Sequence, residues 1–269
     1  QRNFGGHAYP RLAHVGDRTG LEMLRTLQDH GVHQGLDDYQ ECTVTKLFKD
    51  GNRVTGAFGY DRESGQFRVF KAGAVIIATG GIPKDLNIEG KEYCINSDQI
   101  MELKKIPKKL SIIGSGYIAI EFAFIFASLG SKVSLICRKN LLRGFDANLV
   151  SLIKDRLSSK RINIYLNEEV KKISVKKNTK ILLLKKSKKS FYCDQVLVAI
   201  GRKANVKSLN LKKIGIKITK QEAIKVDINL KTNINNIFAI GDVTDRFNLT
   251  PVAIAEGNYL SDKLFGKYK

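Results

Sequence analysis

The chain has 269 residues, of which 43% are hydrophobic, enough for one large or two ordinary α/β domains with a sizeable core. Its formal net charge is +20, and its four cysteines stand far apart, which excludes a disulfide framework and a cysteine metal cluster and favours a reducing cytoplasm. No apolar run approaches the roughly 18 residues that a membrane helix needs, so we expect neither a membrane partner nor a metal site.

The basic residues change in kind along the chain. Through Gly81 there are 3 Lys and 7 Arg, together with all four His, whereas 30 Lys and 6 Arg follow Gly81. This contrast resembles coding bias from two sources, so we expect a chimeric chain. Lysine pairs such as Lys171 and Lys172 lie between short apolar runs without interleaved aromatics. That arrangement favours a solvated basic face over a nucleic-acid surface, with a specific polyanion surface as the alternative.

The first predicted element is a helix over residues 17–31. Thr19 and Glu22 have the spacing of a capping box, and Leu residues recur at the spacing of one helical face. We expect Gly31 to end this helix, because glycine is common just past a helix C-terminus.

Three strand-like runs follow, at residues 40–48, 53–60 and 67–77. Turn sequences separate them, which predicts an antiparallel β-meander. The third run ends in a buried strand that opens into the glycine turn of residues 78–81.

The segments FGGHAYPRLAHVGDRTGLEMLRTLQDHG, ECTVTKL and GAFGYDRESGQFRVFKAGAVIIATGG resemble the flavoprotein subunit of succinate dehydrogenase and fumarate reductase. The resemblance implies the second part of an FAD domain, with Thr79 and Gly80 near the flavin nucleotide. That family's opening glycine motif and its dicarboxylate-binding residues are not matched, so dicarboxylate chemistry is disfavoured. His7 and Arg11 are interpreted as polar loop residues rather than catalysts.

A complete β-turn-α-β unit begins at residue 109. A strand at 109–113 leads into the G-x-G-x-x-A turn of Gly114, Gly116 and Ala119, then a helix that Gly130 closes, then a strand at 132–136. Gly114 allows a tight turn, Gly116 lets the backbone approach a pyrophosphate, and Ala119 permits close packing of helix and strand. The free N–H groups at the helix start favour phosphate, so the unit predicts dinucleotide binding.

The residues after the second strand predict which dinucleotide binds. No acid occurs between Ser131 and Phe145, where an NAD site places a carboxylate, and Arg138, Lys139 and Arg143 stand there instead. Guanidinium groups bind a 2′-phosphate, so we expect NADPH rather than NADH. The alternative is that these residues belong to the general Lys and Arg excess.

Four later segments complete a second resemblance. GSGYIAIEFAFIFASLGSKVSLICR, LLRGFD, VAIGRKAN and IFAIGDVTDRFNLTPVAIAEG are similar to glutathione reductase and the pyridine nucleotide–disulfide oxidoreductases. The resemblance implies an NADPH site in which Arg138 and Arg143 bind the 2′-phosphate, Tyr117 gates the nicotinamide, Glu121 lies near the flavin, and Gly201 and Arg202 line the cofactor. It also implies FAD contacts at Gly241, Asp242 and Thr250. An ordinary turn aspartate is the alternative for Asp242.

We therefore expect an α/β fold in which a Rossmann-like NADPH-binding domain at 82–203 is inserted into an incomplete FAD-binding domain made of 1–81 and 204–269. The family's C-x-x-x-x-C dithiol and its His-Pro interface domain are not matched, so we assign no catalytic residue and expect no family dimer interface. The predicted function is an NADPH-binding flavoprotein oxidoreductase module that retains FAD weakly. A composite chain that binds dinucleotide without catalysis is the alternative.

Overall fold

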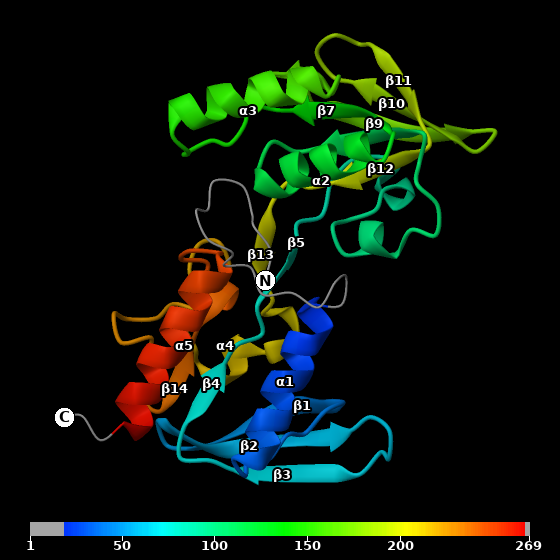
Figure 1. Cartoon of the computed structure of the whole chain (residues 1–269). Helices are drawn as coiled ribbons and strands as arrows, with labels where there is room; N and C mark the ends of the chain where they lie inside the picture. Colours follow the sequence, from blue (N-terminus) through cyan, green and yellow to red (C-terminus); the bar gives the residue numbers. More distant parts are fainter. Residues whose placement is uncertain (1–18, 267–269) are drawn as a thin grey trace. The chain divides into compact units, whose positions relative to one another are not determined.

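The computed structural model describes residues 19–266, with side chains from residue 25 onward. The chain divides into two compact units, residues 1–73 and residues 74–269, which are described separately (Figure 1). His7 and Arg11, together with the side chains of the expected capping box, lie outside the described residues. The mixture of helices with parallel and antiparallel strands confirms the α/β class.

The first unit contains helix α1 (Thr19–His33) and three strands, β1 (Cys42–Asp50), β2 (Arg53–Asp61) and β3 (Phe67–Lys71). The strands pair antiparallel in the order β1-β2-β3, so the predicted β-meander is confirmed. Asp61 supports the second turn, because its Oδ1 accepts hydrogen bonds from the N–H groups of Glu63 and Ser64 at 3.0 and 2.9 Å.

Helix α1 ends two residues later than the sequence predicts, so the expected stop at Gly31 is wrong. Gly35 has the left-handed φ of +73°, its N–H donates to Val32 O at 2.9 Å, and Leu36 N–H donates to Gly31 O at 3.0 Å. These two bonds form a Schellman motif that satisfies the last carbonyls. A glycine ends a helix only where the left-handed conformation is adopted, and here that is Gly35.

The third predicted strand is two strands. β3 ends at Lys71 and pairs with β2, whereas β4 (Val75–Ile77) pairs in parallel with β14 (Ile237–Ala239) in the second unit. The apolar run therefore serves two different sheets, and the chain passes from one unit to the other at Gly73. Hydrophobicity alone does not show this break, since both halves favour strands.

The second unit contains a four-stranded parallel sheet in the order β12-β6-β7-β8. Its members are β6 (Lys109–Ile113), β7 (Lys132–Cys137), β8 (Asn163–Leu166) and β12 (Gln195–Val198). Helix α2 (Tyr117–Ser128) connects β6 to β7, and α3 (Ala147–Ser159) connects β7 to β8. The predicted β-turn-α-β unit is confirmed, and its first strand has the predicted bounds.

Both faces of this sheet are covered, which explains why its strands are apolar at almost every position. Ile112 and Leu135 pack with Ala119 and Ala123 of α2 in one cluster. The alternate residues pack in another cluster against the antiparallel sheet of β9 (Val170–Lys176), β10 (Thr179–Leu184) and β11 (Ser190–Cys193).

Two further strand pairs complete the second unit. β5 (Gly81–Pro83) pairs antiparallel with β13 (Arg202–Ala204), and β4 pairs with β14. Besides the single-turn helix α4 (Leu211–Ile214), this part holds α5 (Thr250–Phe265), whose Leu260 is buried with Leu230 and Phe238.

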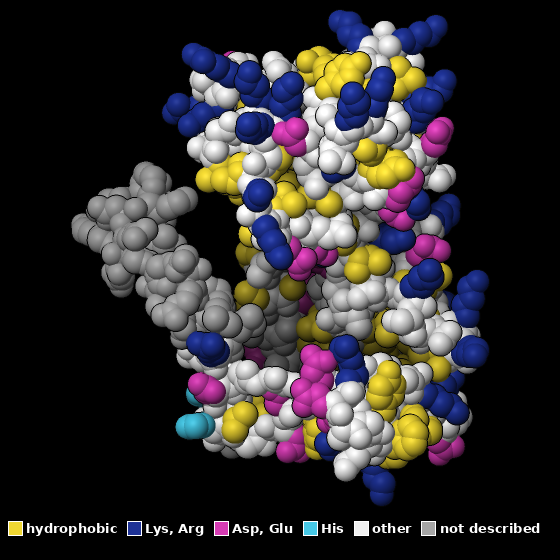
Figure 2. Space-filling model, turned by 90° about the vertical axis from the view of Figure 1, so that its right-hand side faces the viewer, with side chains coloured by type: hydrophobic (Ala, Val, Ile, Leu, Met, Phe, Trp, Pro, Cys, Tyr) yellow, Lys and Arg dark blue, Asp and Glu magenta, His cyan; other side chains and the backbone are white. Residues whose placement is uncertain are grey.

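Figure 2 shows how the charged side chains are distributed on one face of the molecule. On the face drawn in Figure 2, Lys and Arg side chains stand among acidic, apolar and uncharged ones. Within residues 19–266, no helix combines the length and apolarity needed to span a membrane.

Candidate dinucleotide-binding site

Gly114 allows close packing at the first turn of the site, because it has no side chain. Its φ is +149°, and a Cβ there would lie 2.2 Å from Ala199 O and 3.3 Å from Ala119 Cβ. Ala199 follows β12, and its N–H donates to Ile113 O at 2.8 Å, while Ala119 is fully buried on α2. Glycine and alanine at these two positions therefore let the end of β12 and the start of α2 approach the turn closely.

Gly116 has a different surrounding. It is the N-cap of α2 with extended backbone (φ −82°, ψ 177°), and a Cβ there would meet no atom within 4 Å. No side chain caps α2, so its first N–H groups and its positive dipole end remain available to an anion.

A cavity of about 770 Å³ opens beside this turn. It lies at the carboxyl ends of the parallel strands, where open α/β sheets bind their ligands. Six predicted site residues line it: Gly114, Gly116, Tyr117, Arg138, Gly201 and Arg202.

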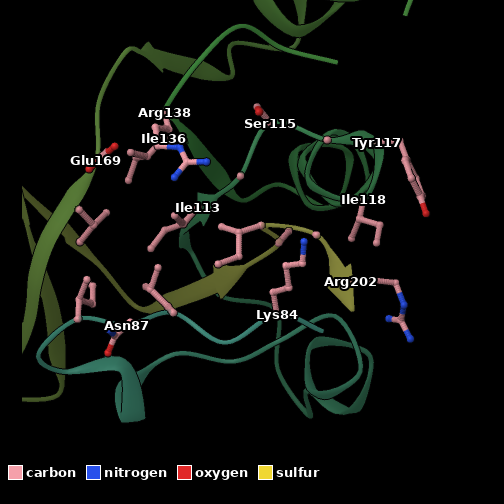
Figure 3. Close-up of a pocket in the computed structure, with 18 of the residues that line it drawn as sticks. Lys84, Asn87, Ile113, Ser115, Tyr117, Ile118, Ile136, Arg138, Glu169 and Arg202 are labelled. Carbon is pink, nitrogen blue, oxygen red and sulfur yellow. The ribbon is translucent and has the colours of Figure 1, made fainter. Parts of the chain in front are cut away.

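Arg138 follows the last residue of β7 and is exposed. Figure 3 shows its guanidinium group pointing into the cavity. Within residues 25–266 no carboxylate lies within 4.0 Å of it. A guanidinium group without an acidic partner is free to bind an anionic ligand.

Two acids that the sequence reasoning missed line the same end of the cavity. Glu168 accepts hydrogen bonds from Ser187 N–H at 3.0 Å and Lys186 N–H at 3.4 Å, and its own N–H donates to Cys137 O at 3.0 Å. Hydrogen bonding from Ser187, its hydroxyl foremost, lowers the pKa of Glu168. Glu169 pairs with Lys185 at 3.5 Å.

Lys84 is a cation that the sequence reasoning also missed. It follows β5, its N–H donates to Gly201 O at 2.9 Å, and its Nζ would lie 4.0 Å from a Cβ at Gly201. Its amine reaches into the cavity in Figure 3. Only the pairing of β5 with β13 brings Lys84 here, and no local sequence signal shows that pairing.

Tyr117 begins α2 and contacts the loop before α5. Its hydroxyl donates to Asn248 O at 3.5 Å, and both Asn248 and Asp245 line the cavity. The predicted gating residue therefore stands where the parallel-sheet part of the second unit meets this loop.

Arg202 lines the cavity but already has partners. Its guanidinium donates to Gly81 O and lies 3.9 Å from Asp98 Oδ1 and 4.0 Å from Asp242 Oδ2. Arg202 thus links the predicted NADPH residues to Asp242 of the predicted FAD group.

The predicted FAD residues gather elsewhere, outside the cavity lining. β4 and β14 run parallel, so Thr79 and Gly80 lie at the same edge as Gly241 and Asp242, and Thr250 begins α5 nearby in the chain. Thr79 Oγ1 donates to Asn205 O at 2.8 Å. Gly241 N–H donates to Glu256 Oε2 of α5 at 2.7 Å, so α5 packs against this edge.

Glu121 and Arg143 lie outside the cavity lining, and both are exposed. Arg143 follows two buried leucines, and Leu142 N–H donates to Ser115 O at 2.8 Å. The two leucines are held in the core, and the residue after them, Arg143, lies outside the cavity. Of the two predicted arginines, Arg138 alone lines the cavity.

Two of the four cysteines are buried and two are half-buried. Cys137 and Cys193 are buried in β7 and β11, whereas Cys42 is only half-buried, because it stands at the start of β1. Burial raises the pKa of Cys137 to about 12 and that of Cys94 to about 11. Over the described range, no three or more His, Cys, Asp or Glu side chains are grouped to hold a metal ion.

Several known proteins are similar to this chain. The family model described as pyridine nucleotide-disulphide oxidoreductase matches residues 9–257. Glutathione reductase of Yarrowia lipolytica is 36% identical over 98% of this chain and 56% of its own length. Trypanothione reductase of Trypanosoma congolense is 40% identical over 80% of this chain and 44% of its own length. The chain thus spans about half the length of these relatives.

A solved structure is also similar. The HOCl-induced flavoprotein disulfide reductase RclA from Escherichia coli has a TM-score of 0.79 and 26% identity, covering 93% of this chain and 56% of its own. One family model runs through both compositional segments, and the predicted likeness of residues 1–81 to the succinate dehydrogenase flavoprotein stays a prediction. By the extent of these matches, the chain belongs to the pyridine nucleotide-disulphide oxidoreductase family.

Proposed function

We propose that the cavity binds a pyridine dinucleotide and prefers NADPH to NADH. The observation that carries this proposal is Arg138, a guanidinium group that follows β7, has no acidic partner in the described part of the chain and lies beside an uncapped helix start. The pyrophosphate would lie against the N–H groups that open α2, and the 2′-phosphate against Arg138.

The two acids in the cavity support the choice of NADPH. An NAD site needs a carboxylate whose oxygens are free to accept the ribose hydroxyls. Here Glu168 already accepts hydrogen bonds from Ser187 and Lys186, and Glu169 is paired with Lys185, so each carboxylate has fewer of its roughly four acceptor positions left for a ribose. Lys84 adds a positive charge to the same cavity and favours the phosphates of either cofactor.

The wider role we propose is a flavoprotein oxidoreductase module, with FAD at the edge shared by β4 and β14. Membership of the family supports it, as does the similarity to RclA, which is a flavoprotein disulfide reductase. The dinucleotide would supply hydride, and the part of this chain would be to bind and orient it. The second candidate is dinucleotide binding without catalysis, which needs only the cavity and the start of α2.

Calorimetric titration of the full chain with NADPH and NADH tests the proposal. We expect NADPH to bind at least about tenfold more tightly, from charge-assisted bonds to the 2′-phosphate. Arg138→Ala should abolish this preference, whereas Arg156→Ala, an equal loss of charge at an exposed position on α3, should retain it. Equal affinities in the wild type, or an unchanged preference in Arg138→Ala, would refute the assignment.

A further inference from the structure

The side-chain amide of Asn248 has one satisfied end and one unsatisfied end. Its Nδ2 donates to Asp245 Oδ1 at 2.9 Å, and because a carboxylate only accepts, the nitrogen must face Asp245. Its Oδ1 is buried and has no hydrogen-bond partner among the residues that the structure describes. A buried acceptor without a donor is uncommon in a folded protein and calls for a specific reason.

The position of Asn248 limits what that reason can be. Asn248 lines the dinucleotide cavity, and its backbone carbonyl accepts the hydroxyl of Tyr117 at 3.5 Å. The neighbouring Asp245 carboxylate also lines the cavity and would repel a phosphate. The missing partner is therefore a hydrogen-bond donor, and an anionic group is disfavoured at this position.

The cavity has two ends of different chemistry. In Figure 3, Arg138 and Tyr117 stand on opposite sides of the view, with Ser115, which lies between the two glycines of the turn, between them. A dinucleotide that places its 2′-phosphate at Arg138 and its pyrophosphate at the start of α2 extends its other end toward Tyr117. That end carries the nicotinamide, whose carboxamide NH₂ is a neutral donor.

We propose that Asn248 Oδ1 accepts a hydrogen bond from the carboxamide NH₂ of the nicotinamide when the Tyr117 ring moves aside. Asn248 is then a specificity-determining residue for the ring end of the cofactor. The inference rests on the proposed dinucleotide function. It concerns reversible binding alone, and no covalent bond is formed or broken.

The test compares three ligands by calorimetry on the full chain. NADP⁺ carries the carboxamide, its 3-acetylpyridine analogue replaces the NH₂ with a methyl group, and 2′,5′-ADP lacks the ring altogether. We expect NADP⁺ to bind the wild type about fivefold more tightly than the analogue, as one hydrogen bond implies. Asn248→Leu should bring that ratio near one and leave 2′,5′-ADP binding unchanged. Asn87→Ala, at another asparagine lining the cavity, should preserve the ratio.

The outcomes separate the two claims. Absence of 2′,5′-ADP binding to the wild type would overturn the proposed function itself. Binding of 2′,5′-ADP together with equal affinities for NADP⁺ and its analogue would overturn the role of Asn248 alone. The wild-type comparison needs no variant, so it decides the inference even if Asn248→Leu does not fold. An unchanged ratio in a folded Asn248→Leu would also overturn it.

Discussion

Gly114 and Gly116 stand two residues apart in one motif and have different structural roles. Gly114 is enclosed, since a Cβ would overlap Ala199 O, whereas Gly116 faces open space beside the cavity. The spacing predicted both roles from the sequence, because the motif forms within one continuous segment. The residue that encloses Gly114 is Ala199, which follows β12 and could not be predicted from that segment.

Alanine substitutions separate these roles. Gly114→Ala should destabilise the fold by roughly 2–3 kcal/mol, since it adds a backbone clash at a positive φ. Gly116→Ala should change stability by less than about 0.5 kcal/mol but weaken NADPH binding about tenfold, because its methyl group occupies the approach to the pyrophosphate. Chemical denaturation and calorimetry measure the two effects. Equal loss of stability in both variants would contradict this assignment.

The thiol of Cys94 yields a prediction about pH. Burial raises its pKa from the ordinary 9.0 to about 11, so the folded protein favours the neutral thiol. This preference contributes stability below pH 9 and is lost as the pH rises toward 11. We expect alkylation of Cys94 in the folded chain, followed by mass spectrometry, to keep accelerating between pH 9 and 11. In denaturant it should level off near pH 9. A plateau near pH 9 in the folded chain would refute the shift.

Among the secondary-structure elements, those built from local signals were predicted well. The strand at 109–113 has its predicted bounds, and the next helix and strand lie within a residue of theirs. The break between β3 and β4 was missed, because it depends on pairing with β14, about 160 residues later in the chain. Sequence periodicity reports burial and not the identity of the partner strand.

The end of α1 can be tested with two glycines. Gly31→Ala should stabilise the chain by about 0.5–1 kcal/mol, since glycine is unfavourable inside a helix and the new Cβ would meet Leu36 Cδ1 at an ordinary 3.6 Å. Gly35→Ala should destabilise it by about 1 kcal/mol, because φ there is +73°. Thermal unfolding followed by circular dichroism gives both values. A helix that ended at Gly31 would reverse the two signs.

For the whole molecule, the family followed from motif blocks spread over the chain, while the lining of the cavity did not. Lys84, Glu169 and Asn248 reach the site from three separate segments, and only the tertiary fold brings them together. The contact of the Tyr117 hydroxyl with Asn248 and the contact of Arg202 with Asp242 could not be predicted from the sequence either.

The arrangement of the glycine turns predicts weak flavin retention by this 269-residue chain. Within residues 25–266 the G-x-G-x-x-A turn at the start of α2 is the site we assign to the pyridine dinucleotide, and FAD needs a phosphate-binding turn of its own. We expect less than about 0.1 equivalent of flavin to remain after incubation with FAD and gel filtration, as read from the absorption spectrum. Stoichiometric yellow protein would show that the edge of β4 and β14 suffices.

A crystal structure of the full chain grown with saturating NADP⁺ tests the central claim most directly. We predict the 2′-phosphate within hydrogen-bonding distance of Arg138 and the pyrophosphate against the first N–H groups of α2. A dinucleotide bound outside this cavity would contradict the account, as would one whose adenosine ribose is held by Glu168 or Glu169 with the 2′-phosphate turned away from Arg138.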